Sequence, residues 1–420
     1  MTNAYVPSLF ALVATLVLWL GTLLLVWLLN HQWWELVTLK RYRLLTPLAG
    51  LAAAAIWSLG ILTGVRWISA IGSFAAAGIL VLLVALLVAL PVSGIILTTA
   101  RIAQALRRWS ERRSAMPSPA LSGAGVVALE QEPGSTVSRR SFLTKASAAI
   151  PAATLSTAAF GLLSAEGPVR MPEIPLYFPG LHPALDGLRI LHISDIHLGN
   201  FTGLGTLESL LQDAAERRPD LVLVSGDIAD DLAQLPDALR MMAALRPRYG
   251  IFATLGNHEY FHDISHVIRI IEAGPIPLLR NTGTIVPVAN TQLYIGGADD
   301  PVSLSARERN HQFLQKSIAA AFNGAPSDAF HLLMSHRPEG FDVAREMGIA
   351  MTVSGHTHGA QLGFNGRSML EPLMPDRYLW GHYERAGSQL YTSAGVGHWF
   401  PFRLGCPAEA PLYVLRRAQA

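Results

Sequence analysis

Acidic, amide and imidazole side chains recur in the second half of this chain, each just after a short apolar segment and within a Gly-rich or polar turn. Groups of this kind, without any thiolate, suit Mn, Fe, Zn or Mg and do not suit soft-metal or iron–sulfur chemistry. Their shared position indicates a single metal site. The candidate ligands are Asp195, His197, Asp227, Asn257, His336, His356 and His358.

The number of these groups indicates how many ions the site holds. Six or seven ligands are too many for one tetrahedral ion. They fit two ions about 3.5–4 Å apart that share one carboxylate, an arrangement that clamps a phosphoryl group during in-line displacement. The sequence therefore predicts a dinuclear centre for phosphoryl chemistry.

The segments before these turns have the composition of buried β-strands. In an extended segment residues i and i+2 project to the same side, so Asp195 and His197 are placed to bind one ion. In open α/β sheets, sites gather outside the carboxyl ends of the strands. Two further segments, 206–218 and 302–322, have helical periodicity and are expected to cover the sheets. The five predicted strands lie within 188–194, 221–225, 250–255, 330–334 and 350–354.

The motifs DIHLG, GDIAD, GNHEY, SHRPEG and GHTHGAQ occur in this order between residues 195 and 361. Together they resemble the five blocks of the calcineurin-like metallophosphoesterase superfamily. The resemblance covers roughly residues 186–416, and the C-terminal tail resembles the bacterial membrane-anchored branch. It implies an α/β fold in which two mixed β-sheets pack face to face with flanking helices.

The resemblance also implies a role for each candidate. One ion would be held by Asp195, His197 and His358, and the second by Asn257, His336 and His356, with Asp227 bridging them. The nucleophile would be a metal-bound hydroxide.

His258 would not bind metal. It would face the substrate and protonate the leaving oxygen or stabilise its charge. Asn200 and His262 follow ligand loops and are candidate substrate contacts. The chain departs from the common pattern at Glu259, where Asp is frequent, and at Ala360, where Gly is frequent, so the geometry of these turns is open.

Several other histidines lack a motif of their own, and a hydrogen-bonded structural role is expected for them. They are His192, His262, His266, His331, His382 and His398.

The N-terminal part of the chain is too apolar for a soluble protein, and hydrophobic residues make up 51% of the 420 residues overall. Residues 7–29, 44–64 and 72–98 lack charged side chains and are long enough to cross a hydrocarbon core about 30 Å thick. Residues 1–100 are therefore expected to form a transmembrane region with three helices. Pro91 predicts a kink or an early end in the third.

Basic residues indicate the orientation, because positively charged segments stay in the cytoplasm. They are concentrated in 30–43 and 99–145, which places the N-terminus outside and predicts a basic, Pro/Ser/Gly-rich cytoplasmic linker at 101–137.

Residues 138–165 begin with Ser138-Arg139-Arg140 and continue as a mildly apolar run. This resembles a twin-arginine export motif placed within the chain. It predicts a fourth span, a multi-pass inner-membrane protein and a catalytic domain at 166–420 on the exoplasmic side. The alternatives are an ordinary helix flanked by arginines or one that lies on the membrane, so a cytoplasmic site stays open.

Net charge and cysteine content narrow the range of possible functions. A net charge of +2, with the basic excess near the predicted spans, gives no nucleic-acid surface, and Cys406, the one cysteine, cannot form an intrachain disulfide. The sequence therefore predicts a membrane-anchored, metal-dependent phosphodiesterase or pyrophosphatase that acts on lipid-linked or envelope phosphate esters. The alternative is a metal-binding membrane scaffold with a non-catalytic phosphoesterase fold.

Overall fold

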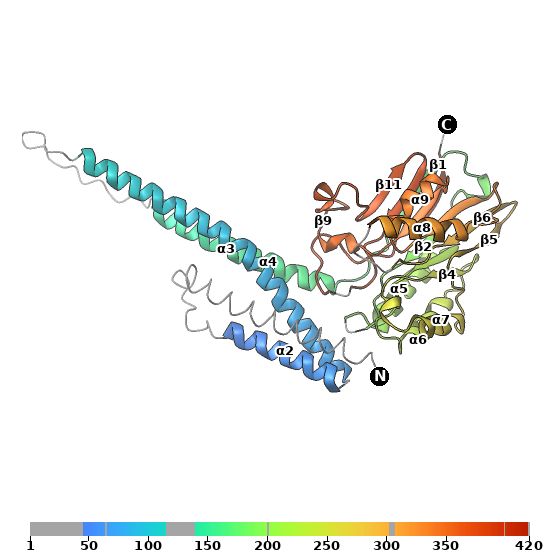
Figure 1. Ribbon diagram of the computed structural model, residues 1–420, viewed down its shortest axis with the longest axis horizontal. Helices are drawn as coiled ribbons and strands as arrows, with labels where there is room; N and C mark the ends of the chain where they lie inside the picture. Colours follow the sequence, from blue (N-terminus) through green and yellow to red (C-terminus); the bar gives the residue numbers. More distant parts are fainter. Residues whose placement is uncertain are drawn as a thin grey trace, which may run out of the picture. The chain divides into compact units, whose positions relative to one another are not determined.

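A computed structural model describes residues 45–63, 65–114, 139–199, 201–301, 307–398 and 400–418 (Figure 1). The chain divides into two compact units, Met1–Phe160 and Gly161–Ala420.

Two mixed β-sheets form the centre of the second unit. The first has the strand order β1-β13-β2-β3-β4, with β1 Glu173–Phe178, β13 Leu412–Arg417, β2 Arg189–Ile193, β3 Leu221–Ser225 and β4 Ile251–Thr254. The second has the order β11-β12-β8-β7-β6-β5, with β11 Gly381–Arg385, β12 Ser388–Thr392, β8 Met351–Ser354, β7 Phe330–Met334, β6 Thr291–Gly297 and β5 Thr282–Val288. A small hairpin, β9 Gly363–Phe364 and β10 Arg367–Ser368, lies outside both sheets.

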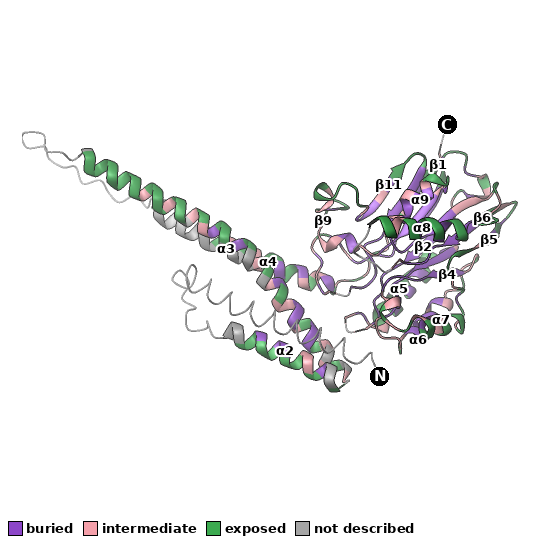
Figure 2. Cartoon of the chain, viewed as in Figure 1, coloured by how far each residue is buried: buried purple, intermediate pink, exposed green. Residues whose placement is uncertain are grey.

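Apolar side chains from both sheets interdigitate in one buried layer, which includes Leu223, Leu332, Val353 and Tyr413. The outer face of the first sheet is covered by α5 Leu204–Arg217, α6 Leu235–Ala243 and α7 Ile264–Glu272. The second sheet is covered by α8 Arg307–Ala321 and α9 Gly340–Glu346. The strands are buried and the outer helix faces exposed (Figure 2). The predicted α/β fold of two facing mixed sheets is confirmed.

The sequence patterns account for these elements. All five predicted strands form, as β2, β3, β4, β7 and β8. Helix α5 buries Leu207, Leu210, Leu211 and Ala214, the i, i+3, i+4, i+7 spacing of one helix face. Short 3₁₀ turns, η2 Pro183–Leu185, η3 Glu259–Phe261, η4 His358–Gln361 and η5 Glu371–Leu373, complete the connections.

The first unit contributes α2 Leu45–Thr63 and α3 Arg66–Ser114, while α4 Arg139–Ala165 extends across the boundary between the units. These helices coincide with the predicted spans at 44–64, 72–98 and 138–165. The remaining predicted span, 7–29, lies outside the described residues. No helix in the described part combines the length and apolarity that crossing a membrane requires. The structure therefore does not confirm the predicted spans.

Helix α3 continues through Pro91 as far as Ser114, so the early end predicted at Pro91 is wrong. A proline removes one backbone hydrogen bond, and helix-favouring residues, Ala and Leu before it and Ala, Arg, Gln and Leu from residue 100 onward, maintain the helical backbone. Residues 101–114 of the predicted linker are helical for the same reason, and 115–138 lie outside the described residues.

The structural role expected for His192 is confirmed. Its ring lies between the two sheets, with Nε2 2.6 Å from the Ser225 hydroxyl and Nδ1 2.8 Å from the Tyr413 hydroxyl. Burial, with a smaller contribution from His336, lowers the pKa of His192 to about 3. The unfolded chain therefore takes up this proton at a higher pH than the folded chain.

This pKa predicts an acid-sensitive fold. The stability contributed by neutral His192 is complete above about pH 6.5 and declines as pH falls toward 3. Between pH 7 and pH 5 the wild type should lose about 2 kcal/mol more unfolding free energy than His192→Gln, which cannot titrate. Urea denaturation at both pH values measures the difference, and equal losses would contradict the argument.

Candidate metal centre

The candidate ligands lie in loops at the carboxyl ends of five strands that belong to both sheets. Asp195 and His197 follow β2, Asp227 follows β3, and Asn257 follows β4. His336 follows β7, and His356 and His358 follow β8. The strand-end placement expected from the sequence is therefore observed.

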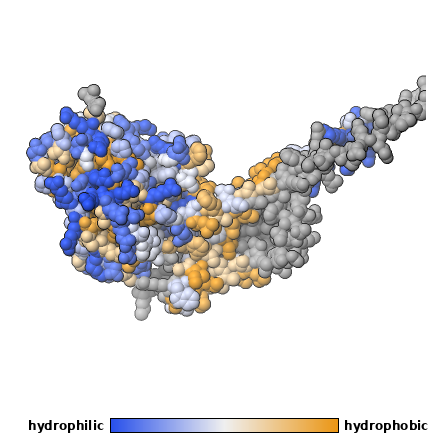
Figure 3. Space-filling view, turned by 180° about the vertical axis from the view of Figure 1, so that it is seen from behind, coloured by the Kyte–Doolittle hydropathy of each residue, from blue (hydrophilic) through white to orange (hydrophobic). Residues whose placement is uncertain are grey.

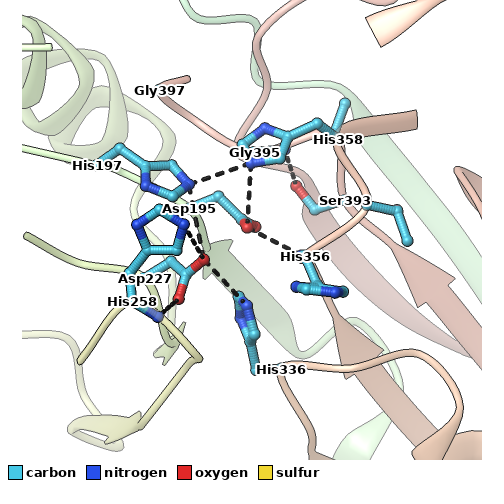
Figure 4. A network of polar contacts seen from close by, with 12 residues as sticks. Asp195, His197, Asp227, His258, His336, His356, His358, Ser393, Gly395 and Gly397 are labelled. Carbon is cyan, nitrogen blue, oxygen red and sulfur yellow. Dashed lines mark hydrogen bonds and ion pairs between the residues drawn. The ribbon is translucent and has the colours of Figure 1, made fainter. Parts of the chain in front are cut away.

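These loops converge in two groups of ligand atoms, and a third group, His197, Asp230 and His258, shares His197 with the first. Within each group all ligand atoms lie within 4.8 Å of one another. The first group is Asp195, His197 and His358, and its imidazole Nε2 atoms lie 3.1 Å apart. Two imidazole nitrogens at this spacing match neighbouring ligands of one ion with bonds of about 2.1 Å. The second group is Asp227, His336 and His356 (Figure 4).

Asp227 lies between the two groups. Its Oδ2 is 3.2 Å from Nε2 of His336 and 3.7 Å from Nε2 of His197. Its Oδ1 accepts a hydrogen bond of 2.9 Å from the backbone N–H of His258. This is the position that a bridging carboxylate requires.

Asn257 is buried next to this carboxylate. Its neighbour His258 donates to Asp227, and a Cβ added to its other neighbour, Gly256, would lie 2.2 Å from Asp227 Oδ1. The Asn257 Oδ1 atom has no hydrogen-bond partner among the described residues. The same holds for Asp195 Oδ2, while His336 Nε2 faces the Asp227 carboxylate. Buried amide and carboxylate oxygens without partners, next to imidazole nitrogens, are the donors a pair of divalent cations needs, so the residues fit the two ions expected.

The backbone of the ligand loops is left-handed at several residues that are not glycine. Values of φ between 49° and 70° occur at Asp195, His197, Asp227, His356 and His358. Such conformations are uncommon for residues with a Cβ and persist where surrounding structure imposes them, often at functional sites. The turns are therefore built to aim these side chains.

Two glycines permit the close packing of the loops. A Cβ at Gly355 would lie 2.0 Å from Asp195 Oδ2, and one at Gly226 would lie 2.5 Å from the Gly256 nitrogen. Both substitutions would push ligand loops apart. Gly226, beside Asp227, thus allows the backbone of the next ligand loop to approach closely.

The charges of the centre are strongly coupled. Burial opposes ionisation of Asp227, but the neighbouring histidines, His336 above all, hold its pKa well below the usual range. Burial likewise opposes charge on His336, yet Asp227, Asp195 and Asp300 together raise its pKa to about 10. Carboxylates that favour a proton on His336 also favour a divalent cation in its place, so metal binding at this position displaces a proton.

Asp230 is a member of the centre that the sequence analysis missed. Its Oδ1 lies 2.6 Å from Nδ1 of His258, and its Oδ2 lies 3.3 Å from Nδ1 of His197. Burial opposes its ionisation, but these imidazoles lower the pKa of Asp230 strongly. Because it meets the Nδ1 side of both rings, it orients their Nε2 atoms toward the other ligands. Its place in the GDIAD motif, three residues after Asp227, was the available signal.

Glu259, the first departure from the family pattern, holds the turn together. Its carboxylate accepts hydrogen bonds from the backbone N–H groups of Gly256, Asp227 and Ile228, at 2.7, 2.9 and 2.8 Å. The longer side chain of Glu therefore ties the loop after β4 to the loop after β3. At the second departure, Ala360 has a φ of 52°, where Gly would be less strained.

Glu259→Gln is expected to lower the free energy of unfolding by about 2–3 kcal/mol, because the neutral amide accepts through one oxygen and leaves buried N–H groups unpaired. Urea denaturation measures the change. Glu208→Gln, at an exposed position of α5, is the matched control and should stay within about 0.5 kcal/mol of the wild type. Equal stability of the two variants would show that the hydrogen bonds of Glu259 contribute nothing to the free energy of unfolding.

Arg403 is a second supporting residue that the sequence did not reveal, and no motif marks it. It is fully buried, and its Nη2 donates to the carbonyls of Ala394, Gly395 and Gly397 at 2.9, 3.1 and 2.8 Å. The backbone N–H of Gly397 in turn donates to the Asp195 carbonyl. A buried guanidinium thus fixes the loop that packs against the first ligand group, and Figure 4 shows this loop beside His358.

The two candidate substrate contacts have different outcomes. Asn200 lies outside the described residues. His262 is half-buried at the end of η3. Burial is the main cause that lowers its pKa, and the charges of Asp230 and His258 also act on it. Among the other histidines, His331 and His382 make the structural hydrogen bonds expected of them, to the Pro326 carbonyl and the Gln389 side chain.

Comparisons with known proteins support the interpretation of these ligand groups as a phosphoesterase metal centre. Residues 188–360 match the family model described as calcineurin-like phosphoesterase. The "Transmembrane protein with metallophosphoesterase domain" of Danio rerio is 28% identical over 273 residues, which cover 63% of this chain and 61% of that protein. An "Uncharacterized metallophosphoesterase" of Helicobacter pylori J99 is 27% identical over 256 residues, which cover 60% and 65%. "Phosphodiesterase YaeI" of Escherichia coli K12 is 26% identical over 240 residues, which cover 54% and 82%.

The chain spans less than two thirds of the length of the first two relatives. The relatives come from animals and from bacteria, so they support the superfamily and not the narrower bacterial branch expected from the sequence. Residues 188–360, the segment that carries the two ligand groups, are thus similar to calcineurin-like phosphoesterases.

Proposed function

We propose that this chain is a phosphoric ester hydrolase that works with two divalent metal ions. The observation that carries the proposal is the position of Asp227, whose carboxylate lies between two separate groups of ligand atoms. Asp195, His197 and His358 hold one ion, Asn257, His336 and His356 hold the other, and Asp227 bridges them. When bound, the pair supplies charge neutralisation at the phosphoryl oxygens and an activated water.

His258 is the proposed leaving-group acid. Its Nδ1 is held by Asp230 at 2.6 Å, and its Nε2 lies 3.9 Å from Asp227 Oδ2, on the side of the ligand groups. In hydrolysis a water oxygen bonds to phosphorus while the bond from phosphorus to the ester oxygen breaks. His258 donates a proton from Nε2 to that departing oxygen. Asp230 is a positioning residue, since it acts through the ring it holds.

The test uses the full-length chain, purified in detergent and loaded with Mn²⁺. Hydrolysis of bis-p-nitrophenyl phosphate that stops on chelation and returns with metal supports a phosphodiesterase. A folded sample that holds two metals per chain and turns over neither this diester nor p-nitrophenyl phosphate would favour the alternative, a metal-binding scaffold. A scaffold has no need of the Asp230–His258 pair, so we favour the enzyme.

We further propose that the chain is attached to a membrane and acts on phosphate esters at its surface, lipid-linked ones included. Helices α2 and α3 carry exposed apolar side chains, among them Leu48, Leu59, Trp67, Val88 and Ile95. Apolar residues gather on the described helices, whereas hydrophilic residues predominate on the face of the second unit in Figure 3. Two relatives are named transmembrane proteins with a metallophosphoesterase domain.

The export motif at 138–165 supports an exoplasmic position for the domain. Alkaline phosphatase fused after Ala420 is therefore expected to be active in intact bacterial cells, because this enzyme requires an oxidising compartment. A cytoplasmic reporter at the same position should be inactive. The reverse pattern would overturn the proposed orientation without affecting the metal centre.

A further inference from the structure

A polar cavity of about 660 Å³ adjoins the metal centre. Its walls come from α8, α9, the segment that follows β7, and Arg377. His356, a member of the second ligand group, lines it as well. A phosphorus atom bound at the ligand groups would thus have one of its ester substituents directed toward this space.

Arg337 lies where the cavity meets the ligand groups. Its side chain is 5% exposed, its Nε donates to Asp300 Oδ2 at 2.9 Å, and its Nη1 lies 3.1 Å from Nε2 of His356. Its Nη2 is buried and has no hydrogen-bond partner among the described residues. A buried guanidinium nitrogen without an acceptor is unfavourable, and a phosphoryl oxygen is an acceptor whose geometry a guanidinium matches.

The rest of the lining is suited to hydroxyl groups. The carboxylates of Glu308, Glu339, Asp342 and Glu346 line it, together with Arg345 and Arg377, which pair with the last three of these carboxylates through one oxygen each. Oε2 of Glu339 is buried without a partner among the described residues. Carboxylates accept hydrogen bonds and cannot donate them when ionised, so they favour ligands rich in hydroxyl donors. Among the described residues, Leu314 is the one apolar side chain that contributes to the lining, and no Phe, Tyr or Trp does.

We propose that this cavity is the alcohol subsite of the enzyme and that it takes a small polyol or sugar esterified to phosphate. Arg337 binds a phosphoryl oxygen, and the wall carboxylates accept hydrogen bonds from the hydroxyls of the alcohol. With a single apolar side chain and no Phe, Tyr or Trp among the described lining residues, the cavity disfavours a stacked nucleobase or an acyl chain. A lipid substrate would place its polar headgroup here and its chains elsewhere.

This inference rests on the proposed phosphoesterase activity, and one experiment tests the two separately. The full-length, Mn²⁺-loaded chain is given glycerophosphoglycerol, a polyol diester, or bis-p-nitrophenyl phosphate, which has no hydroxyl. The readout is the ratio of kcat/KM for the first diester to that for the second. A ratio removes changes in metal loading or in the fraction of active enzyme.

The double variant Glu308→Gln/Glu346→Gln is expected to lower this ratio about tenfold, because two charged acceptors become neutral amides. Glu216→Gln/Glu272→Gln, at exposed glutamates of α5 and α7, is the matched control and should keep the wild-type ratio. Arg337→Lys should raise KM for glycerophosphoglycerol at least about tenfold, because a lysine lacks the planar fork of donors.

An unchanged ratio in the cavity variant, or wild-type hydrolysis of bis-p-nitrophenyl phosphate without any hydrolysis of the polyol diester, would overturn the subsite and leave the proposed function standing. If the metal-loaded protein hydrolyses neither diester, the proposed function fails, and the subsite fails with it.

Discussion

Asp227→Asn is expected to lower kcat/KM for bis-p-nitrophenyl phosphate by about three orders of magnitude, roughly 4 kcal/mol of transition-state stabilisation. The carboxylate approaches one ligand group through its contact with His197 and the other through its contact with His336. An asparagine offers a single neutral oxygen and an NH₂ group that repels cations. The substitution should therefore remove the bridge while preserving the volume of the side chain.

Metal content separates this loss from unfolding. We expect the variant to hold fewer than two metals per chain by elemental analysis, with a far-UV spectrum like that of the wild type. Asp328→Asn, at an exposed position before β7, is the matched control and should keep full activity and both metals. An Asp227→Asn protein with two tightly bound metals and wild-type turnover would contradict a bridging role.

The sequence allows the frame of this centre to be predicted because two short-range rules determine it. Apolar runs bounded by turn residues predict strands, and polar residues directly after such runs lie at strand ends. Both rules hold for β2, β3, β4, β7 and β8, so the loops that converge were identifiable. Which strand pairs with which does not follow from these rules. The parallel pairing of β1 with β13, whose partners are separated by more than 200 residues, depends on long-range packing.

The supporting residues were beyond sequence reasoning because their roles depend on reach through space. Glu259 acts through backbone N–H groups about 30 residues away in sequence, and Arg403 acts through carbonyls of a loop without regular structure. Arg337 is separated by 37 positions from the carboxylate that anchors it. A motif marks the residues that bind metal or substrate. The residues that hold them become visible only when the loops are folded together.

In the helical region, by contrast, a local sequence signal was given too much weight. Composition predicted helices at 44–64 and 72–98, and α2 and α3 form there, but the early end, one of the two effects predicted for Pro91, does not occur. A single proline removes one hydrogen bond from a helix of 49 residues, whereas many helix-favouring residues on both sides maintain it. A single helix-breaking residue can therefore end a short helix, but it does not end one as long as α3.

His258→Ala is expected to lower kcat about 100-fold or more for an alkyl phosphodiester, because the departing alkoxide then receives no proton. The loss should be much smaller for bis-p-nitrophenyl phosphate, since nitrophenolate is a stable anion that departs without protonation. Metal content should stay at two per chain, because His258 is not among the seven residues proposed to hold the two ions, and its Nδ1 is engaged by Asp230.

The dependence on the leaving group is the discriminating measurement. Asp230→Asn should show the same dependence with a smaller loss, because the ring of His258 keeps its place but loses the carboxylate that orients it at 2.6 Å. A residue that only supported the fold would lower turnover of both diesters by the same factor. Equal losses for the alkyl and nitrophenyl esters would therefore remove His258 from the proton transfer, and the acid would have to come from the solvent side of the centre.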